Sequence, residues 1–333
     1  MTAPWLDVRA LRVEFPAGSA PHAPALRAVD GVSFALERGG ALGLAGESGC
    51  GKSTVARALV GLAQPRSGSI RLEGVELAAQ AAHRPAAARR RLQIVFPDGP
   101  SSLDPRQTVG QILEEPLVLH RKGNRRERLA RAVALLDAVG LDAGQLERYP
   151  HEFSADQRQR IAIARALALE PELLVLDEPA RGLDSSVRAQ LVQLLVQLRE
   201  HFGLALLLTT QDLALVHVLC EDVALMYLGQ VCEYGSCSEV FGAPRHPYTQ
   251  GLLAAVPLPD PSAARRRARA ILSGEVPTPA APPSGCRFHP RCPVREQVPG
   301  ERCAREEPRL VCAPTTQATQ VACHLYAALT PPR

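Results

Sequence analysis

The stretch GALGLAGESGCGKSTVARALVGL, from Gly40 to Leu62, decides the fold of this chain. It opens with an apolar run typical of a buried strand and closes with a pattern typical of an α-helix. Between them, residues 46–54 fit the pattern G-x-x-x-x-G-K-S/T. Glycines at these positions let successive backbone N–H groups surround phosphate oxygens, and the helix start adds its dipole. The order of strand, glycine-rich loop and helix therefore predicts a phosphate site.

The residue types in this loop fit the binding of a nucleoside triphosphate. Lys52 would supply positive charge to the β- and γ-phosphates, and the Ser53 hydroxyl would be a magnesium ligand. The alternative, a glycine-rich turn without a ligand, is disfavoured because the expected strand and helix flank the pattern. The candidate nucleotide contacts are Gly46, Glu47, Ser48, Gly49, Cys50, Gly51, Lys52, Ser53 and Thr54.

A second motif, LLVLDEP, places Asp177 and Glu178 at the end of an apolar strand. Binding sites of open α/β sheets lie at this end of the strands. Asp177 fits a magnesium ligand, and Glu178 fits a base that polarises the attacking water. An acidic pair alone would more often cap a turn, but beside the phosphate loop it predicts catalysis by Lys52 and Glu178.

Apolar runs alternate with helical patterns over the first 250 residues. This alternation predicts an α/β fold with a mainly parallel sheet covered by helices. Residues 97–170 lack a convincing strand and are interpreted as an inserted helical subdomain. Beyond Pro244 the sequence turns rich in proline and cysteine. We therefore expect a nucleotide-binding domain over residues 1–245 and a C-terminal extension over residues 246–333.

Composition narrows the class of protein. Apolar runs such as Leu204 to Leu208 are far shorter than the roughly 20 residues of a membrane span, and residues 1–10 show no signal-peptide pattern. We expect a cytosolic chain. Only 4% of residues are aromatic, and the arginine runs at 88–92 and 263–270 lack interleaved aromatics. Nucleic-acid binding is therefore not expected.

These motifs resemble those of the ATP-binding subunits of ABC transporters, in particular the oligopeptide/dipeptide import class. The phosphate loop, RYPHEFSADQRQRIAIARALALEPELLVLDEP and GLDSSVRAQ follow the order and spacing of that family. The segments HPYTQGLLAAVP and PPSGCRFHPRCP look like the C-terminal region of peptide and nickel importers. The resemblance covers nearly the whole chain. It implies a P-loop NTPase fold of the ABC type, an ATPase activity, and ATP and Mg²⁺ as cofactors.

The resemblance also implies partners. Two ATP-binding subunits pair head to tail on two membrane-spanning permease subunits, at the cytoplasmic face of the membrane, and a solute-binding protein acts indirectly. Phe15 would stack on adenine, although a core aromatic in an edge strand is the alternative. By the same resemblance, the helix that begins after Ser154 is the family's signature helix. Its first residues, Ser154 and Gln157, would contact the partner's ATP. Locally they form a capping box, S-x-x-Q.

The chain departs from the family pattern at several positions. Where the family has Ser-Gly-Gly-Gln, this chain has Ala155 and Asp156 in place of the two glycines. The negative charge of Asp156 would repel phosphate. Pro97 replaces a glutamine that contacts magnesium, Gln211 replaces a histidine that contacts the γ-phosphate, and Arg181 replaces a small residue. Gln211 can still donate a hydrogen bond but cannot carry charge.

These departures, with the phosphate loop and acidic pair retained, predict ATP binding with weakened hydrolysis. Three interpretations stay open: a working transport ATPase, a pseudo-ATPase that holds ATP beside an active partner, and a soluble ABC protein acting on nucleic acid. The partner subunit is expected to be a different chain, because a homodimer would have no intact site. The transported solute, whether a peptide, nickel or another small ligand, is not encoded in these motifs.

The extension concentrates cysteines. Cys286, Cys292, Cys303 and Cys323 match the family's tail pattern, with five, ten and nineteen residues between successive members. These gaps are unlike the C-x₂-C hairpins of most zinc sites. The resemblance favours an iron–sulfur cluster of the 4Fe–4S type over zinc, and reduced buried thiols are the third alternative.

Overall fold

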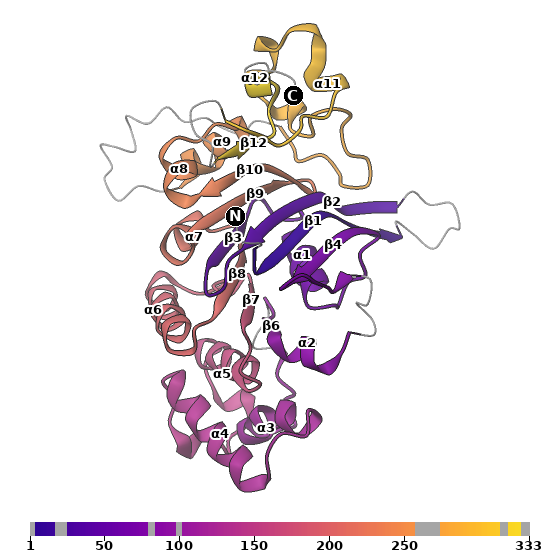
Figure 1. Cartoon of the computed structure of the whole chain (residues 1–333). Coiled ribbons are helices and arrows are strands. Elements are labelled where there is room, and N and C mark those ends of the chain that lie inside the picture. The colour runs from indigo at the N-terminus through magenta and orange to yellow at the C-terminus, as the bar shows by residue number, and fades with distance from the viewer. Residues whose placement is uncertain are drawn as a thin grey trace.

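The computed structural model describes residues 4–16, 25–78, 84–97, 102–256, 274–313 and 319–327. Within these ranges the strands form two sheets (Figure 1). The smaller sheet is antiparallel, with strand order β2-β1-β4-β5. Its strands are β1 (Leu6–Pro16), β2 (Ala25–Leu36), β4 (Ser67–Leu72) and β5 (Val75–Glu76).

The larger sheet has strand order β11-β12-β10-β9-β3-β8-β7-β6 in the described residues. Its centre, from β9 to β6, is parallel, which confirms the predicted α/β fold. The strands are β3 (Ala41–Ala45), β6 (Leu92–Val95), β7 (Leu173–Asp177), β8 (Ala205–Thr210), β9 (Asp222–Tyr227), β10 (Gln230–Ser236), β11 (Val311–Cys312) and β12 (Gln320–Val321).

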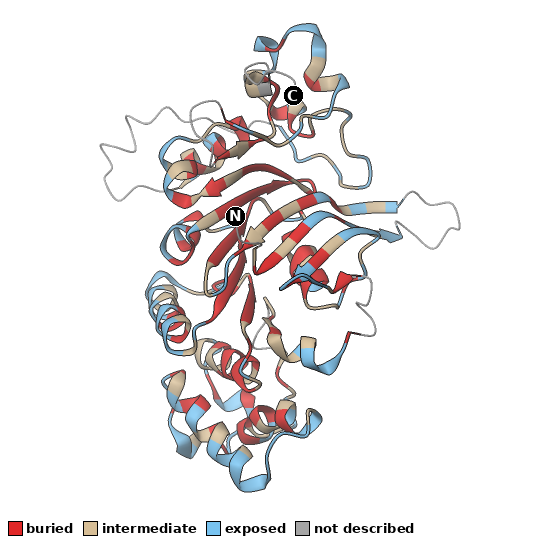
Figure 2. Cartoon of the chain, viewed as in Figure 1, coloured by how far each residue is buried: buried red, intermediate tan, exposed pale blue. Residues whose placement is uncertain are grey.

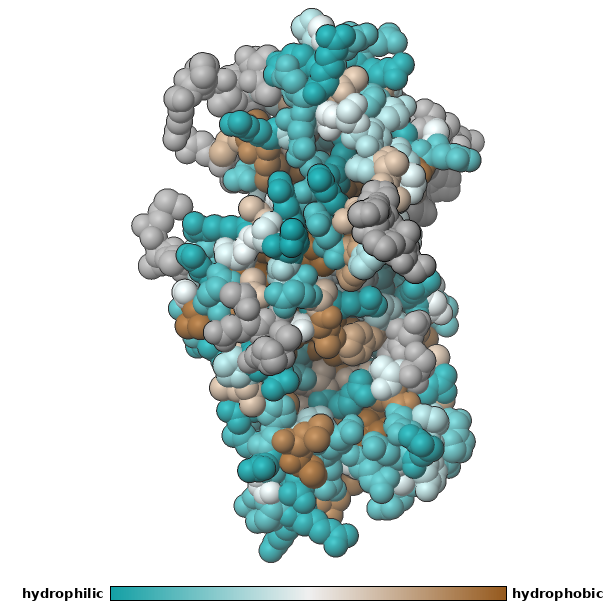
Figure 3. All heavy atoms as spheres, turned by 90° about the vertical axis from the view of Figure 1, so that its right-hand side faces the viewer, coloured by the Kyte–Doolittle hydropathy of each residue, from teal (hydrophilic) through white to brown (hydrophobic). Residues whose placement is uncertain are grey.

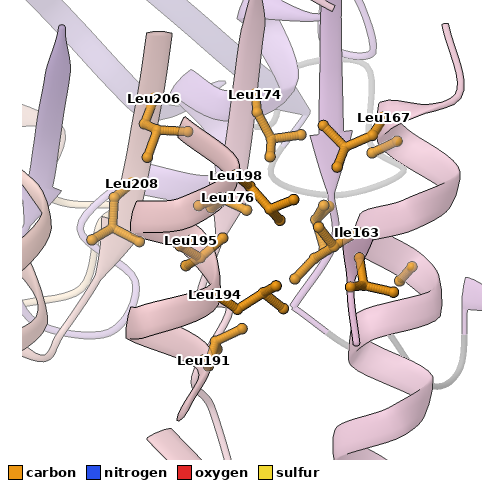
Figure 4. Packing of buried hydrophobic residues seen from close by; sticks show 14 of the residues in the cluster. Ile163, Leu167, Leu174, Leu176, Leu191, Leu194, Leu195, Leu198, Leu206 and Leu208 are labelled. Carbon is orange, nitrogen blue, oxygen red and sulfur yellow. The ribbon is translucent and has the colours of Figure 1, made fainter. Parts of the chain in front are cut away.

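The central strands are apolar throughout because both faces of this sheet are covered. In β7, Leu174 and Leu176 belong to a core on the helical side, whereas Leu173 and Val175 belong to a core shared with the smaller sheet. Figure 2 shows the central strands as the most continuously buried part of the chain. On the helical side, leucines of α6 (Ser185–Phe202) meet those of β7 and β8 (Figure 4).

The helices lie mainly on the face of the larger sheet that α6 covers and at one end of the molecule. Residues 102–170 contain helices and no strand among the residues that the structure describes there, and they lie at the end opposite the extension (Figure 1). The remaining helices are α1 (Lys52–Leu59), α2 (Ala86–Arg91), α3 (Val109–Leu119), α4 (Arg125–Ala138), α5 (Ala155–Leu167), α7 (Leu213–Leu219), α8 (Cys237–Gly242), α9 (Pro247–Ala255), α11 (Arg302–Arg305) and α12 (His324–Ala327). Short 3₁₀ helices span Ala143–Gln145, Pro150–Glu152, His289–Arg291, Arg295–Gln297 and Pro299–Glu301.

The C-terminal extension is built into the larger sheet. Strand β12 pairs antiparallel with β10, and β11 pairs with β12. The backbone N–H of Ala322 also donates to the carbonyl of Cys232, at 2.8 Å. The extension thus continues the same sheet that carries the phosphate loop at the end of β3.

None of the helices in the described residues has the length and hydropathy to cross a membrane. On the face drawn in Figure 3, exposed apolar side chains form separate patches among hydrophilic ones.

Candidate functional site

The phosphate loop joins β3 to α1 in a conformation that requires its glycines. Gly46, Gly49 and Gly51 all have positive φ, and Gly51 caps α1 in the left-handed region. A Cβ on Gly46 would lie 2.2 Å from the carbonyl oxygen of Met226, and one on Gly51 would lie 2.3 Å from that of Ala28. The loop therefore packs backbone against backbone at two points, which side chains would prevent.

Lys52 lies at the first position of α1 with its ammonium group turned back over the loop. Its Nζ donates to the carbonyls of Gly46, at 2.8 Å, and Glu47, at 3.0 Å. The Oε1 of Glu178 lies 3.8 Å from the same nitrogen. With the lysine side chain only 4% exposed, the ammonium is a largely desolvated charge at the centre of the loop.

Ser53 and Asp177 meet as the sequence predicts. The Ser53 hydroxyl donates to Oδ1 of Asp177 at 2.7 Å, and the Thr209 hydroxyl donates to the same oxygen. Asp177 is fully buried at the end of β7, and its Oδ2 has no hydrogen-bond partner among the described residues. A buried carboxylate oxygen without a donor, next to a hydroxyl, fits the ligands that Mg²⁺ prefers.

Glu178 stands in a strained backbone conformation. Its φ is 47°, in the left-handed region that non-glycine residues rarely adopt, and its N–H donates to the Thr209 carbonyl at 2.9 Å. Such strain costs about 1–3 kcal/mol and concentrates at functional sites. It turns the carboxylate toward Lys52, where it could polarise a water molecule.

A pocket of about 390 Å³ opens in front of this loop. Phosphate-loop residues, Glu178 and the predicted adenine contact Phe15 border the same space, and Phe15 is 39% exposed. Glu47, Gly46 and Cys50 are not among its walls. The lining consists of Phe15, Leu26, Ala28, Ser48, Gly49, Gly51, Lys52, Ser53, Thr54, Pro97, Glu178, Arg181, Gln211 and Pro279.

Three of the departures from the family pattern line this one pocket. Pro97 and Gln211 border it together with Glu178, so both replacements lie beside the candidate ligand space. Arg181, three residues after Glu178, adds a guanidinium to the same lining. Compared with the pattern that the resemblance implies, the pocket would gain a cation and lose an imidazole.

Ser154 and Gln157 lie elsewhere, at the exposed start of α5. The Gln157 N–H donates to the Ser154 hydroxyl at 3.3 Å, and the Ser154 N–H donates to the Gln157 amide oxygen at 3.1 Å. This is the capping box predicted from local sequence. Asp156, between them, accepts from Nε of Arg160 at 3.2 Å. None of these residues lines this chain's own pocket.

Glu47 makes contacts that the sequence did not predict. Its carboxylate pairs with Arg291, and its N–H donates to the hydroxyl of Tyr248. Both partners belong to the extension, 244 and 201 residues away in the sequence. The segment HPYT signalled the extension, but no local pattern signals a contact across such a separation.

The structure does not support a cluster or zinc at the cysteines. Burial raises the pKa of Cys286 to about 12 and that of Cys323 to about 11, with smaller contributions from neighbouring thiols. The charges of Cys323, Cys303 and Cys292 each add to the rise in the pKa of Cys286. However, no three His, Cys, Asp or Glu side chains among the described residues are arranged to hold a metal ion. The expected iron–sulfur or zinc ligand set is therefore unsupported.

Comparison with known families gives two matches. The ABC transporter family model matches residues 29–181, which contain the phosphate loop, the signature helix and the acidic pair. A second model, the C-terminal region of oligopeptide/dipeptide transporters, matches residues 232–298, which contain Tyr248 and Arg291.

Individual proteins extend these matches along most of the chain. A probable peptide ABC transporter ATP-binding protein of Sinorhizobium fredii is 47% identical over 92% of this chain and 84% of its own. The oligopeptide transport ATP-binding protein OppF of Escherichia coli is 46% identical over 86% and 84%. Among solved structures, a dimeric ATP-binding cassette with ADP and phosphate is 25% identical over 70% of this chain and 98% of its own, with a TM-score of 0.61.

Proposed function

The chain belongs to the ABC transporter family as an ATP-binding subunit of the peptide/oligopeptide import class, and from this premise we propose that its own site binds MgATP but hydrolyses it slowly. One observation carries the proposal. The side chains that would bind phosphate and magnesium lie together, whereas Pro97 and Gln211 line the pocket where the family resemblance implies a glutamine and a histidine.

Binding draws on Lys52, Ser53 and Asp177. Lys52 brings a desolvated positive charge to the β- and γ-phosphates, once its ammonium turns from the loop carbonyls to the ligand. Ser53 and Asp177 would hold Mg²⁺, which supplies positive charge against the phosphate oxygens when bound. The remaining proposed nucleotide contacts are Phe15 on adenine and the backbone N–H groups from Gly46 to Thr54.

Hydrolysis draws on Glu178, which would orient water toward the γ-phosphate. Gln211, an exposed residue at the pocket, can donate a hydrogen bond to that phosphate but cannot carry a proton or a charge. Pro97 has neither an amide side chain nor a backbone N–H. Hydrolysis depends on charge and on the position of the water molecule. These replacements would therefore weaken hydrolysis more than they weaken ATP binding.

The proposed assembly follows the family. Residues 1–245 bind the nucleotide, with residues 97–170 as a helical subdomain, and residues 246–333 form the extension. The chain would pair with a second, different ATP-binding subunit on two permease subunits, peripherally at the cytoplasmic face of the membrane, with a solute-binding protein supplying the peptide. Ser154 and Gln157 would contact the partner's ATP.

Steady-state ATP hydrolysis by the purified pair of ATP-binding subunits tests the proposal. Glu178→Gln is introduced into this chain, or the matching glutamate is changed in the partner. We expect the pair to keep more than about half of its turnover with Glu178→Gln here, and to lose nearly all of it with the partner's change. Loss of turnover with Glu178→Gln in this chain would show instead that its site is the working one.

A further inference from the structure

Every polar group of Glu47, the first side chain of the phosphate loop, is bound. Its carboxylate accepts two hydrogen bonds from Arg291, at 2.7 Å and 3.1 Å, in a bidentate pair. Its N–H donates to the Tyr248 hydroxyl at 2.8 Å, and its carbonyl accepts from Lys52 at 3.0 Å. Two of these three partners come from the C-terminal extension.

The Arg291 pair lies in a shielded, aromatic setting. The Arg291 side chain is 5% exposed and also donates to the Tyr227 hydroxyl at 3.3 Å. Its guanidinium carbon lies 5.8 Å from the centre of the Tyr227 ring and 6.0 Å from that of Phe288. Tyr227, Tyr248 and Phe288 form one buried cluster. Because the arginine of this charge pair is shielded from water and held by packed rings, it has little freedom to rearrange.

A second set of contacts supports the loop from behind. Arg287, on the same segment as Arg291, donates to the Leu228 carbonyl and to the Asp30 carboxylate. Gly229, which follows Leu228 in the sequence, donates its N–H to the carbonyl of Cys50 at 2.8 Å. The extension therefore reaches the loop directly at Glu47 and indirectly at Cys50.

A loop with three glycines at positive φ has many conformations in the unbound state, and only one presents its N–H groups to phosphate. We propose that Arg291 and Tyr248 are positioning residues that hold Glu47, and with it the phosphate loop, in the ATP-binding conformation. The extension is thereby a working part of the nucleotide site. Pro279, which lines the pocket together with Phe15, adds a second contribution from the same region. This inference rests on the proposed function, since it takes ATP as the ligand.

Equilibrium titration of the full-length chain with ATP tests the inference. Arg291→Lys keeps the charge but loses the bidentate geometry, and Tyr248→Phe keeps the ring but loses the acceptor. We expect each to raise the Kd for ATP by about three- to tenfold. Arg305→Lys is the matched control on the extension, because Arg305 is 72% exposed and its side chain pairs with the exposed Glu301 among the described residues. Its Kd should equal that of the wild type.

A double-mutant cycle separates positioning from general stability. Once Glu47→Gln has removed the carboxylate, adding Arg291→Lys should raise the Kd by less than twofold further. Melting temperatures are measured in parallel. A lowered melting temperature with an unchanged Kd in both variants would overturn the inference and leave a purely structural role. Lys52→Ala tests the proposed function itself, because a wild type that binds ATP no better than this variant would overturn both proposals.

Discussion

At the start of the signature helix, Asp156 does not present a free charge. Arg160 follows one turn later, with its Nε 3.2 Å from the Asp156 carboxylate, and its Nη1 donates to the carbonyl of Val139 at 3.0 Å. The two side chains are 24% and 17% exposed, for Asp156 and Arg160 respectively. The repulsion of phosphate that the sequence indicates is therefore partly neutralised by a neighbour on the same helix face.

This pairing predicts opposite effects of two substitutions at the site that we propose is shared with the partner's ATP. Asp156→Asn removes the negative charge and should raise the apparent affinity of the partner's site for ATP about two- to fivefold. Arg160→Met leaves Asp156 uncompensated and should lower it by a similar factor. The measurement is the KM of the heterodimer, with the melting temperature checked because Arg160 also binds Val139. Shifts in the same direction would rule out an electrostatic cause.

Gln211 offers a second test at the residue scale. Gln211→His returns a group that can carry charge and move a proton at the pocket that Glu178 lines. We expect the kcat of this chain's site to rise about tenfold with little change in KM, measured in a pair whose partner site has been inactivated. Gln211→Ala is the control and should not accelerate turnover. An unchanged kcat with histidine would show that another group, such as Pro97, limits the rate.

At the scale of elements, helix α9 places Tyr248 against the phosphate loop, and its start depends on a neutral histidine. His246 is the N-cap, and its Nδ1 accepts from the Tyr248 N–H at 3.1 Å. The backbone N–H groups of Arg245 and His246 donate to the carboxylate of Glu233, each at 2.9 Å. Burial lowers the pKa of His246 to about 4, because a charged imidazole would lose its solvation there.

A pH dependence of stability follows. The unfolded histidine takes up a proton near pH 6.5 and the folded one only near pH 4. The contribution of neutral His246 to the free energy of unfolding is therefore complete above pH 6.5 and is lost as the pH falls toward 4. It amounts to on the order of 3 kcal/mol in total. Burial raises the pKa of Glu233, which acts in the opposite sense. Denaturant melts of wild type and His246→Asn between pH 7 and 4 isolate the histidine: the difference in unfolding free energy should shrink as the pH falls. A constant difference would contradict this.

Elements with strong local signals could be predicted from the sequence, and the others could not. Strands β3 and β7 were visible as apolar runs, and the capping box of α5 was visible at Ser154 and Gln157. Strands β11 and β12 have two residues each, too few for any periodicity. Likewise, the contact of Glu47 with Arg291 and the positive φ of Glu178 arise from tertiary packing, which no local pattern encodes.

At the scale of the whole molecule, the proposed nucleotide pocket lies between two parts of the chain to which we assign different tasks. The helical region with α3 and α4 is at one end, and the extension is at the other (Figure 1). The signature helix α5 lies on the helical side and does not line the pocket of its own chain, whereas the extension contacts its own phosphate loop. One end would thus serve the partner's ATP and the other end this chain's own ATP.

This arrangement predicts which dimer ATP can stabilise. In a head-to-tail homodimer, both shared sites would combine Pro97 and Gln211 with Asp156, whereas a pair with a different subunit would contain each departure at one site only.

Light scattering of the Glu178→Gln chain with ATP should therefore show monomers when it is alone and a dimer when the partner subunit is added. Lys52→Ala in this chain should weaken that dimer, because one of its two nucleotides would be lost. A stable ATP-dependent dimer of this chain alone would contradict the choice of a different partner. Replacing Ala155 and Asp156 together by glycine should shift the isolated chain toward a homodimer, because the helix start could then approach phosphate without the Cβ or the carboxylate.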